Sequence, residues 1–144
     1  YDVIHIDIQW FLTNCDDKDK VVGYITKIVL DELKDVYPDI LPSEVLSLPD
    51  ALSRVRNKTG RKFVIIIDEW DVLIRDEAAN KKVQDDYIRF LRSMFKGIEP
   101  TKYIQLAYLT GILPIKKEKT QSALNNFDEF TMLDAKAFAP YIVV

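Results

Sequence analysis

A short apolar run that ends in carboxylates constrains the fold of this chain most strongly. Residues 63–67 read Phe-Val-Ile-Ile-Ile, and Asp68, Glu69 and Asp71 follow directly. A continuous apolar run without polar alternation is typical of a strand buried on both faces, as in a parallel sheet covered by helices. Ligands of such sheets bind at the carboxyl ends of the strands, and Asp68 and Glu69 are expected to lie at that end.

The rest of the chain alternates predicted strands with predicted helices. Predicted strands cover residues 1–11, 63–67 and 103–109, with a short candidate at 130–133, and predicted helices cover 19–37, 48–60 and 80–96, with another beginning at 135. The helices follow from apolar residues at helical spacing. This alternation indicates an α/β fold: a three-layer sandwich with a mainly parallel sheet, right-handed crossovers and helices on both faces.

Composition limits the classes of protein to which the chain can belong. With 144 residues, 48% of them apolar and 30% charged, we expect one globular domain over residues 1–144. The net charge of −3 gives no electrostatic signature of nucleic-acid or membrane binding. The one cysteine, Cys15, excludes an internal disulfide, and the one histidine, His5, is expected to face a helix or solvent from its strand. No apolar run is long enough to cross a bilayer and no signal peptide is visible, so we expect a cytoplasmic protein.

Four apolar residues followed by Asp-Glu form the Walker B pattern of P-loop ATPases. In those enzymes the aspartate supports Mg²⁺, usually through water, and the glutamate orients the water that attacks the γ-phosphate. The simpler interpretation is a buried strand followed by a solvated acidic turn. The pattern alone does not separate the two interpretations.

Three motifs stand in order along the chain. The acidic strand end at 63–71 is followed by Leu-Thr-Gly-Ile at 109–112 and by Ser-Ala-Leu-Asn-Asn-Phe at 122–127, which leads into Thr-Met-Leu at 131–133. In this order they resemble the predicted AAA-ATPase-like family of bacterial proteins, whose domain is often fused to a nuclease-like domain of the PD-(D/E)xK type. The resemblance extends over nearly the whole chain.

The resemblance implies roles for residues of the first two motifs. Asp68 would be the Walker B carboxylate that supports Mg²⁺, and Glu69 the catalytic carboxylate. Thr110 would occupy the sensor position, where a hydroxyl bonds the γ-phosphate or the attacking water; its alternative is a strand-end hydroxyl in a turn. Asp71 would either support the Mg²⁺ shell or cap the following segment.

The third motif and the implied ligands complete the resemblance. Asn125 and Asn126 match the family pattern, and their amides would bridge a loop and the nucleotide. The implied ligands are ATP and Mg²⁺. Because AAA-like proteins often form rings, the resemblance also allows a homo-oligomer.

The chain departs from the family in one respect. A P-loop has the pattern G-x-x-x-x-G-K-[ST], whose backbone N–H groups cradle the phosphates. None of the four glycines is followed by lysine, and the chain begins at Tyr1, directly in strand-like sequence. We therefore expect a partial domain truncated before Walker A, in which ATP is bound and hydrolysed only together with the missing N-terminal part.

Two other functions stay open at this point. The first is a non-catalytic α/β module that binds or regulates a partner, which loss of Walker A from the gene itself would favour. The second is a metal-dependent nuclease that uses Asp68, Glu69 and Asp71, since acidic clusters bind Mg²⁺. Such nucleases place a lysine two residues beyond an acidic residue on a strand. Asp134-Ala135-Lys136 has this spacing, but it opens a predicted helix.

Overall fold

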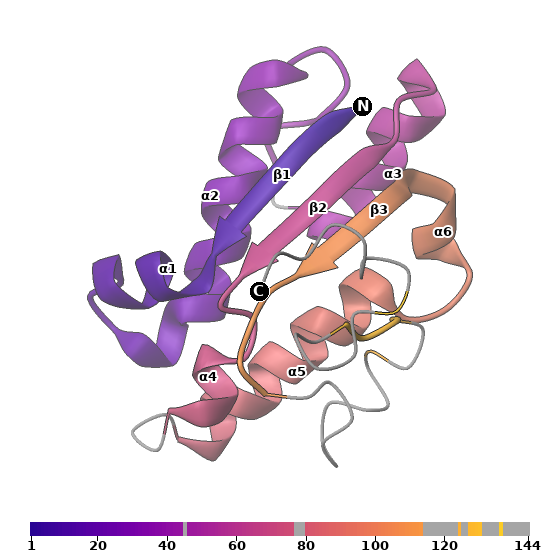
Figure 1. The fold of residues 1–144 in the computed structure, drawn as a ribbon. Helices are drawn as coiled ribbons and strands as arrows, with labels where there is room; N and C mark the ends of the chain where they lie inside the picture. Colours follow the sequence, from indigo (N-terminus) through magenta and orange to yellow (C-terminus); the bar gives the residue numbers. More distant parts are fainter. Residues whose placement is uncertain (45, 77–79, 114–123, 125–126, 131–135, 137–144) are drawn as a thin grey trace.

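A computed structural model describes residues 1–44, 46–76, 80–113, 124, 127–130 and 136 of the chain. Its elements are β1 (Asp2–Asp7), α1 (Ile8–Asn14), the 3₁₀ turn η1 (Lys18–Lys20), α2 (Val21–Val36), α3 (Leu48–Thr59), β2 (Phe63–Asp68), α4 (Val72–Arg75), α5 (Lys81–Phe95), α6 (Glu99–Tyr103) and β3 (Ile104–Leu109) (Figure 1). The strand predicted at 130–133 and the helix predicted from 135 fall largely outside the described residues.

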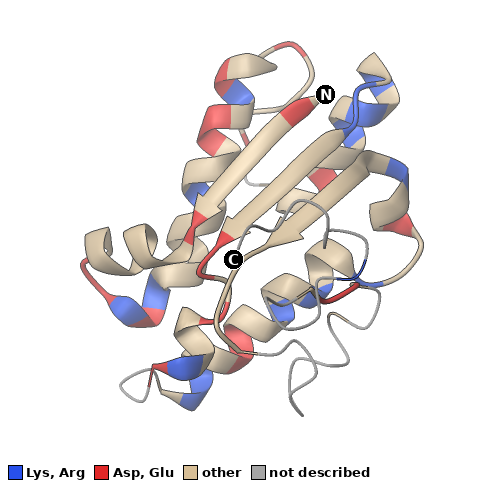
Figure 2. Cartoon of the chain, in the orientation of Figure 1, with Lys and Arg blue, Asp and Glu red and all other residues tan. Residues whose placement is uncertain are grey.

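The three strands form one parallel sheet in the order β1-β2-β3, with β2 in the centre. Asp7 of β1 lies opposite Asp68 of β2, and Ile67 of β2 lies opposite Leu109 of β3. The carboxyl ends of the strands therefore meet at one edge of the sheet, where β1 and β2 both end in acidic residues (Figure 2). The predicted α/β fold with a parallel sheet is confirmed.

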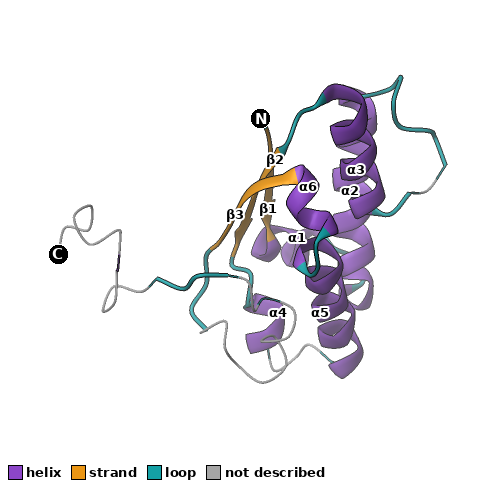
Figure 3. Cartoon of the chain, turned by 90° about the vertical axis from the view of Figure 1, so that its right-hand side faces the viewer, coloured by secondary structure: helices purple, strands orange, loops and turns teal. Residues whose placement is uncertain are grey.

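The helices pack against one face of this sheet. The buried side chains of β1 and β2 are Ile4, Ile6, Phe63, Ile65 and Ile67. Seen edge-on, α2, α3 and α5 all lie on one side of the strands (Figure 3). Val3, Leu106 and Tyr108 point to the opposite face and are exposed. In the described part of the chain the helices thus cover one face, whereas the sequence led us to expect both.

A capping aspartate ends the first strand earlier than expected. The Asp7 carboxylate accepts a hydrogen bond of 3.1 Å from the backbone N–H of Trp10, so β1 stops at Asp7 and α1 starts at Ile8. Aspartate is among the residues preferred at this position because its oxygen satisfies an otherwise unpaired N–H group. The prediction of a strand over 1–11 was therefore wrong in its second half.

Other helix ends agree with the sequence. Asn80 caps α5 by accepting a hydrogen bond from the N–H of Val83. Gly60 ends α3 with a φ of 74°, in the left-handed region that glycine enters without a steric penalty. The three predicted helices correspond to α2, α3 and α5 and are confirmed. The short helices α4 and α6 were not predicted.

Candidate functional site

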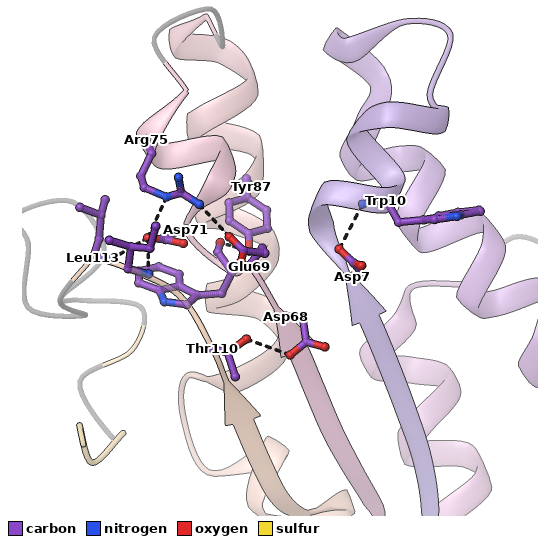
Figure 4. A network of polar contacts seen from close by, with 11 residues as sticks. Asp7, Trp10, Asp68, Glu69, Asp71, Arg75, Tyr87, Thr110 and Leu113 are labelled. Carbon is purple, nitrogen blue, oxygen red and sulfur yellow. Dashed lines mark hydrogen bonds and ion pairs between the residues drawn. The ribbon is translucent and has the colours of Figure 1, made fainter. Parts of the chain in front are cut away.

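Polar side chains from all three strands meet near the carboxyl edge of the sheet. Asp68 ends β2, Thr110 directly follows β3, and His5 lies on β1. The Thr110 hydroxyl donates a hydrogen bond of 2.8 Å to Oδ1 of Asp68 (Figure 4). Nε2 of His5 lies 2.6 Å from the other oxygen, Oδ2. The Asp68 carboxylate is thus held by a residue from each neighbouring strand.

These contacts favour the ionised form of the Asp68 carboxyl group. The hydrogen bond with His5, followed by the one from Thr110, holds the pKa of the Asp68 carboxyl below its ordinary value, because both favour the charged form. From the sequence, Asp68 was expected at the carboxyl end of its strand and Thr110 in the sensor position, whereas the contact with His5 was not predicted. The alternation of side chains in β1 could have indicated this contact, because it puts His5 on the same side of the strand as Asp7, which lies opposite Asp68.

Asp71 plays a different part, because it is fully buried. Its Oδ2 accepts hydrogen bonds from the backbone N–H groups of Ile112, at 3.0 Å, and Leu113, at 2.6 Å. The same oxygen forms an ion pair of 3.1 Å with Nε of Arg75. Asp71 therefore ties the turn after β2 to the turn after β3, a role that the sequence analysis did not foresee.

Further hydrogen bonds join these two turns. The Trp70 N–H donates to the Thr110 carbonyl, and the Thr110 N–H donates to the Ile67 carbonyl, both at 2.9 Å. The buried Tyr87 hydroxyl of α5 donates to the Trp70 carbonyl. Burial raises the pKa of Tyr87, so this hydroxyl keeps its proton and remains a donor. The two turns consequently form one hydrogen-bonded unit that sets the position of Thr110.

The Glu69 side chain takes no part in this hydrogen-bonded unit and points toward Arg75 at the end of α4. The backbone of Glu69 has a φ of 54°, a left-handed conformation that costs a non-glycine residue about 1 to 2 kcal/mol. Its Oε2 lies 2.8 Å from Nη2 of Arg75. In Figure 4 the Glu69 side chain points toward Arg75, while Asp68 points toward Thr110. The two adjacent carboxylates therefore have different partners.

A groove with a volume of about 610 Å³ runs along β3. It is lined by β3 itself and also by Trp70, Gly111 and residues 127–130. Among the described residues, β3 pairs only with β2, so its other edge lies free beside this groove. Asn125 and Asn126, the remaining predicted site residues, lie outside the described part of the chain.

The fold and this edge of the sheet define an α/β protein with a polar site at the ends of parallel strands, the position at which such sheets bind ligands. The sequence model described as "Predicted AAA-ATPase" matches residues 1–120, and the chain belongs to this family. Neither a search of curated proteins nor a search of solved structures found a match. No helix of the described residues is both long and apolar enough to span a membrane.

Proposed function

We propose that this chain is the Walker B and sensor part of an AAA-like ATPase that hydrolyses ATP with Mg²⁺. The observation that carries the proposal is the hydrogen bond between Thr110 and Asp68. It joins a hydroxyl and a carboxylate from neighbouring strand ends, at the edge where parallel sheets bind ligands. Membership in the predicted AAA-ATPase family supports the same assignment.

Asp68 is the residue that would hold Mg²⁺. Its carboxylate is ionised and partly exposed, which suits a hard cation that prefers oxygen ligands. Mg²⁺ in phosphate-transfer sites keeps several waters and uses one or two carboxylates beside the substrate phosphates, so one carboxylate is sufficient. Bound there, the ion would neutralise charge on the phosphates. We leave Asp71 out of this shell because its side chain is fully buried, whereas that of Asp68 is 38% exposed.

Glu69 and Thr110 would act on the attacking water and the γ-phosphate. A glutamate carboxylate accepts a hydrogen bond from the water, which orients the water oxygen for in-line attack and draws off its proton. The Thr110 hydroxyl has one proton, now donated to Asp68, and lone pairs that can accept from the water. Alternatively, the hydroxyl turns and donates to a γ-phosphate oxygen. Thr110 would thereby sense whether that phosphate is present.

The phosphate cradle would come from outside these 144 residues, because they contain no P-loop pattern. The free edge of β3 and the groove beside it leave room for a further parallel strand, whose following loop would then lie near Thr110. Asn125 and Asn126 would add contacts to the nucleotide. Assembly into a homo-oligomer is part of the same proposal.

Neither alternative function has an observation in its favour. A metal-dependent nuclease needs carboxylates that converge on the cation, whereas Asp68 bonds Thr110, Glu69 turns toward Arg75 and Asp71 is buried. In the ranges that the structure describes, no group of three or more His, Cys, Asp or Glu residues could hold a metal. A non-catalytic module would share the fold and differs from the proposal in its response to the experiment below.

The test is Glu69→Gln in the natural full-length protein, with ATP hydrolysis and ATP binding measured separately. Removing a carboxylate that positions the water should slow hydrolysis by about 10²-fold or more, the range of general base catalysis, while binding is kept. Glu32→Gln, an exposed glutamate on α2, is the matched control and should leave the rate unchanged. Equal rates for wild type and Glu69→Gln would remove Glu69 from the reaction and favour the non-catalytic module.

A further inference from the structure

We infer that Arg75 is a positioning residue that holds Glu69 away from Asp68 and Thr110. The inference rests on the proposed ATPase function and adds a residue that limits the rate of hydrolysis at the same site. It is based on one geometric feature: a single guanidinium bridges Glu69 and Asp71, which have separate tasks. In this arrangement Arg75 keeps the water-orienting carboxylate in a resting position.

The bridge uses two different nitrogens of the guanidinium. Nη2 lies 2.8 Å from Oε2 of Glu69, and Nε lies 3.1 Å from Oδ2 of Asp71. The planar fork of arginine can reach two acceptors at once, which the point charge of lysine cannot do as well. Arg75 ends α4, the helix that starts right after the acidic turn, so its side chain folds back over that turn.

The two ends of the bridge differ in how firmly they are held. Asp71 is fully buried and also accepts the N–H groups of Ile112 and Leu113, so its carboxylate cannot move without breaking several contacts. The Glu69 side chain is 47% exposed, and its backbone is in the left-handed region. Glu69 is therefore the end that can be released, while Arg75 stays anchored on Asp71.

Release of Glu69 matters because its Oε2 is engaged by Arg75. A carboxylate that orients and deprotonates water must point toward that water, and the pair with Arg75 turns Glu69 away from Asp68 (Figure 4). The fraction of time that Glu69 spends away from Arg75 would consequently set the rate of the chemical step, without changing how tightly ATP binds.

The experiment is Arg75→Lys in the full-length protein, alone and combined with Glu69→Gln. Lysine keeps a positive charge near buried Asp71 but lacks the second nitrogen that pairs with Glu69. We therefore expect the lysine side chain to keep the ion pair with Asp71 and to lose the one with Glu69. The expected result is a kcat for ATP hydrolysis raised about twofold to fivefold, the range for loss of one partly exposed ion pair, with KM unchanged. In the Glu69→Gln background, Arg75→Lys should have no effect.

Matched variants separate this effect from loss of structure. Arg61→Lys removes the fork of an arginine that pairs with Asp2 at the opposite end of the sheet, and it should leave kcat unchanged. If Arg75→Lys unfolds, as seen by circular dichroism, Arg75→Gln keeps an amide that can donate to Asp71 and is measured instead.

The possible outcomes are distinct. A kcat that is unchanged or lowered by the Arg75 variant, or one that changes equally with Gln at position 69, overturns the inference while leaving the ATPase proposal in place. Wild-type protein without ATP hydrolysis, or with a rate insensitive to Glu69→Gln, overturns the proposed function and the inference together.

Discussion

Replacing Gly111 with alanine should destabilise the fold, because the new methyl group has no room. A Cβ built at this position would lie 2.6 Å from Oδ1 of Asp71 and 2.6 Å from Cδ1 of Trp70. Both side chains are buried, so neither can swing out into solvent to make space. The methyl group must therefore push the turn after β3 away from the turn after β2.

The structure also sets the size of the effect. Ordinary van der Waals contact begins at 3.4 Å, so the neighbouring atoms would have to move by about 0.8 Å. Overpacking of this kind typically costs about 1 to 3 kcal/mol. A shift of the turn instead weakens the hydrogen bonds from Ile112 and Leu113 to the Asp71 carboxylate, and a hydrogen bond to a charged group is worth about 1.5 to 3 kcal/mol. Either route predicts a loss of roughly 2 kcal/mol in the free energy of unfolding.

The measurement is urea unfolding followed by circular dichroism, with Gly23→Ala as the control. Gly23 lies inside α2, and nothing comes within 4 Å of a Cβ placed there. Alanine should therefore stabilise that helix by about 0.5 to 1 kcal/mol. The two substitutions are chemically identical and should have opposite signs. A Gly111→Ala protein as stable as wild type would refute the argument that the two turns are in tight contact.

Two further predictions concern the hydrogen bonds around the site. Thr110→Val keeps the shape but removes the hydroxyl that stabilises charged Asp68, so the pKa of Asp68 should rise toward its ordinary value in an NMR titration of its carboxyl. A lowered folded-state pKa contributes to the free energy of unfolding above the unfolded-state pKa, and this contribution is lost as the pH falls through the folded-state value. The difference in free energy of unfolding between wild type and Thr110→Val should therefore shrink on acidification. An Asp68 pKa that is the same in both proteins would contradict this reasoning. Tyr87→Phe leaves the Trp70 carbonyl without its buried donor and should cost about 1 to 3 kcal/mol in urea unfolding, whereas an unchanged midpoint would show that the carbonyl finds another partner.

The parts of the fold that sequence predicted well are those with a long or uninterrupted pattern. The apolar run of β2 has no polar residue before Asp68, and the apolar stripe of α5 recurs over four turns, so each excludes other structures. The short helices α4 and α6 span four and five residues, too few for a helical period to show.

The error at β1 has a specific cause. Ile4, Ile6 and Ile8 alternate with polar residues, which extends the strand pattern past Asp7. Beyond Asp7, however, Ile8, Phe11 and Leu12 are buried at helical spacing. Both periods fit the same short stretch, and the N-cap bond made by Asp7 decides between them in favour of the helix.

The acidic turn illustrates what sequence alone could not provide. Asp68, Glu69 and Asp71 are nearly adjacent in the chain, which suggests one acidic cluster, yet the structure gives each of them a different environment. The left-handed backbone at Glu69 turns its side chain toward Arg75, and the start of α4 buries Asp71 beneath the turn after β3. Of these three, only Asp68 lies at the sheet edge, where hydrogen bonds with His5 and Thr110 hold its pKa below the ordinary value. Such a division of one acidic turn suits an in-line attack on a phosphate, which needs carboxylates with separate tasks, and it does not suit a reaction that needs three of them on one cation.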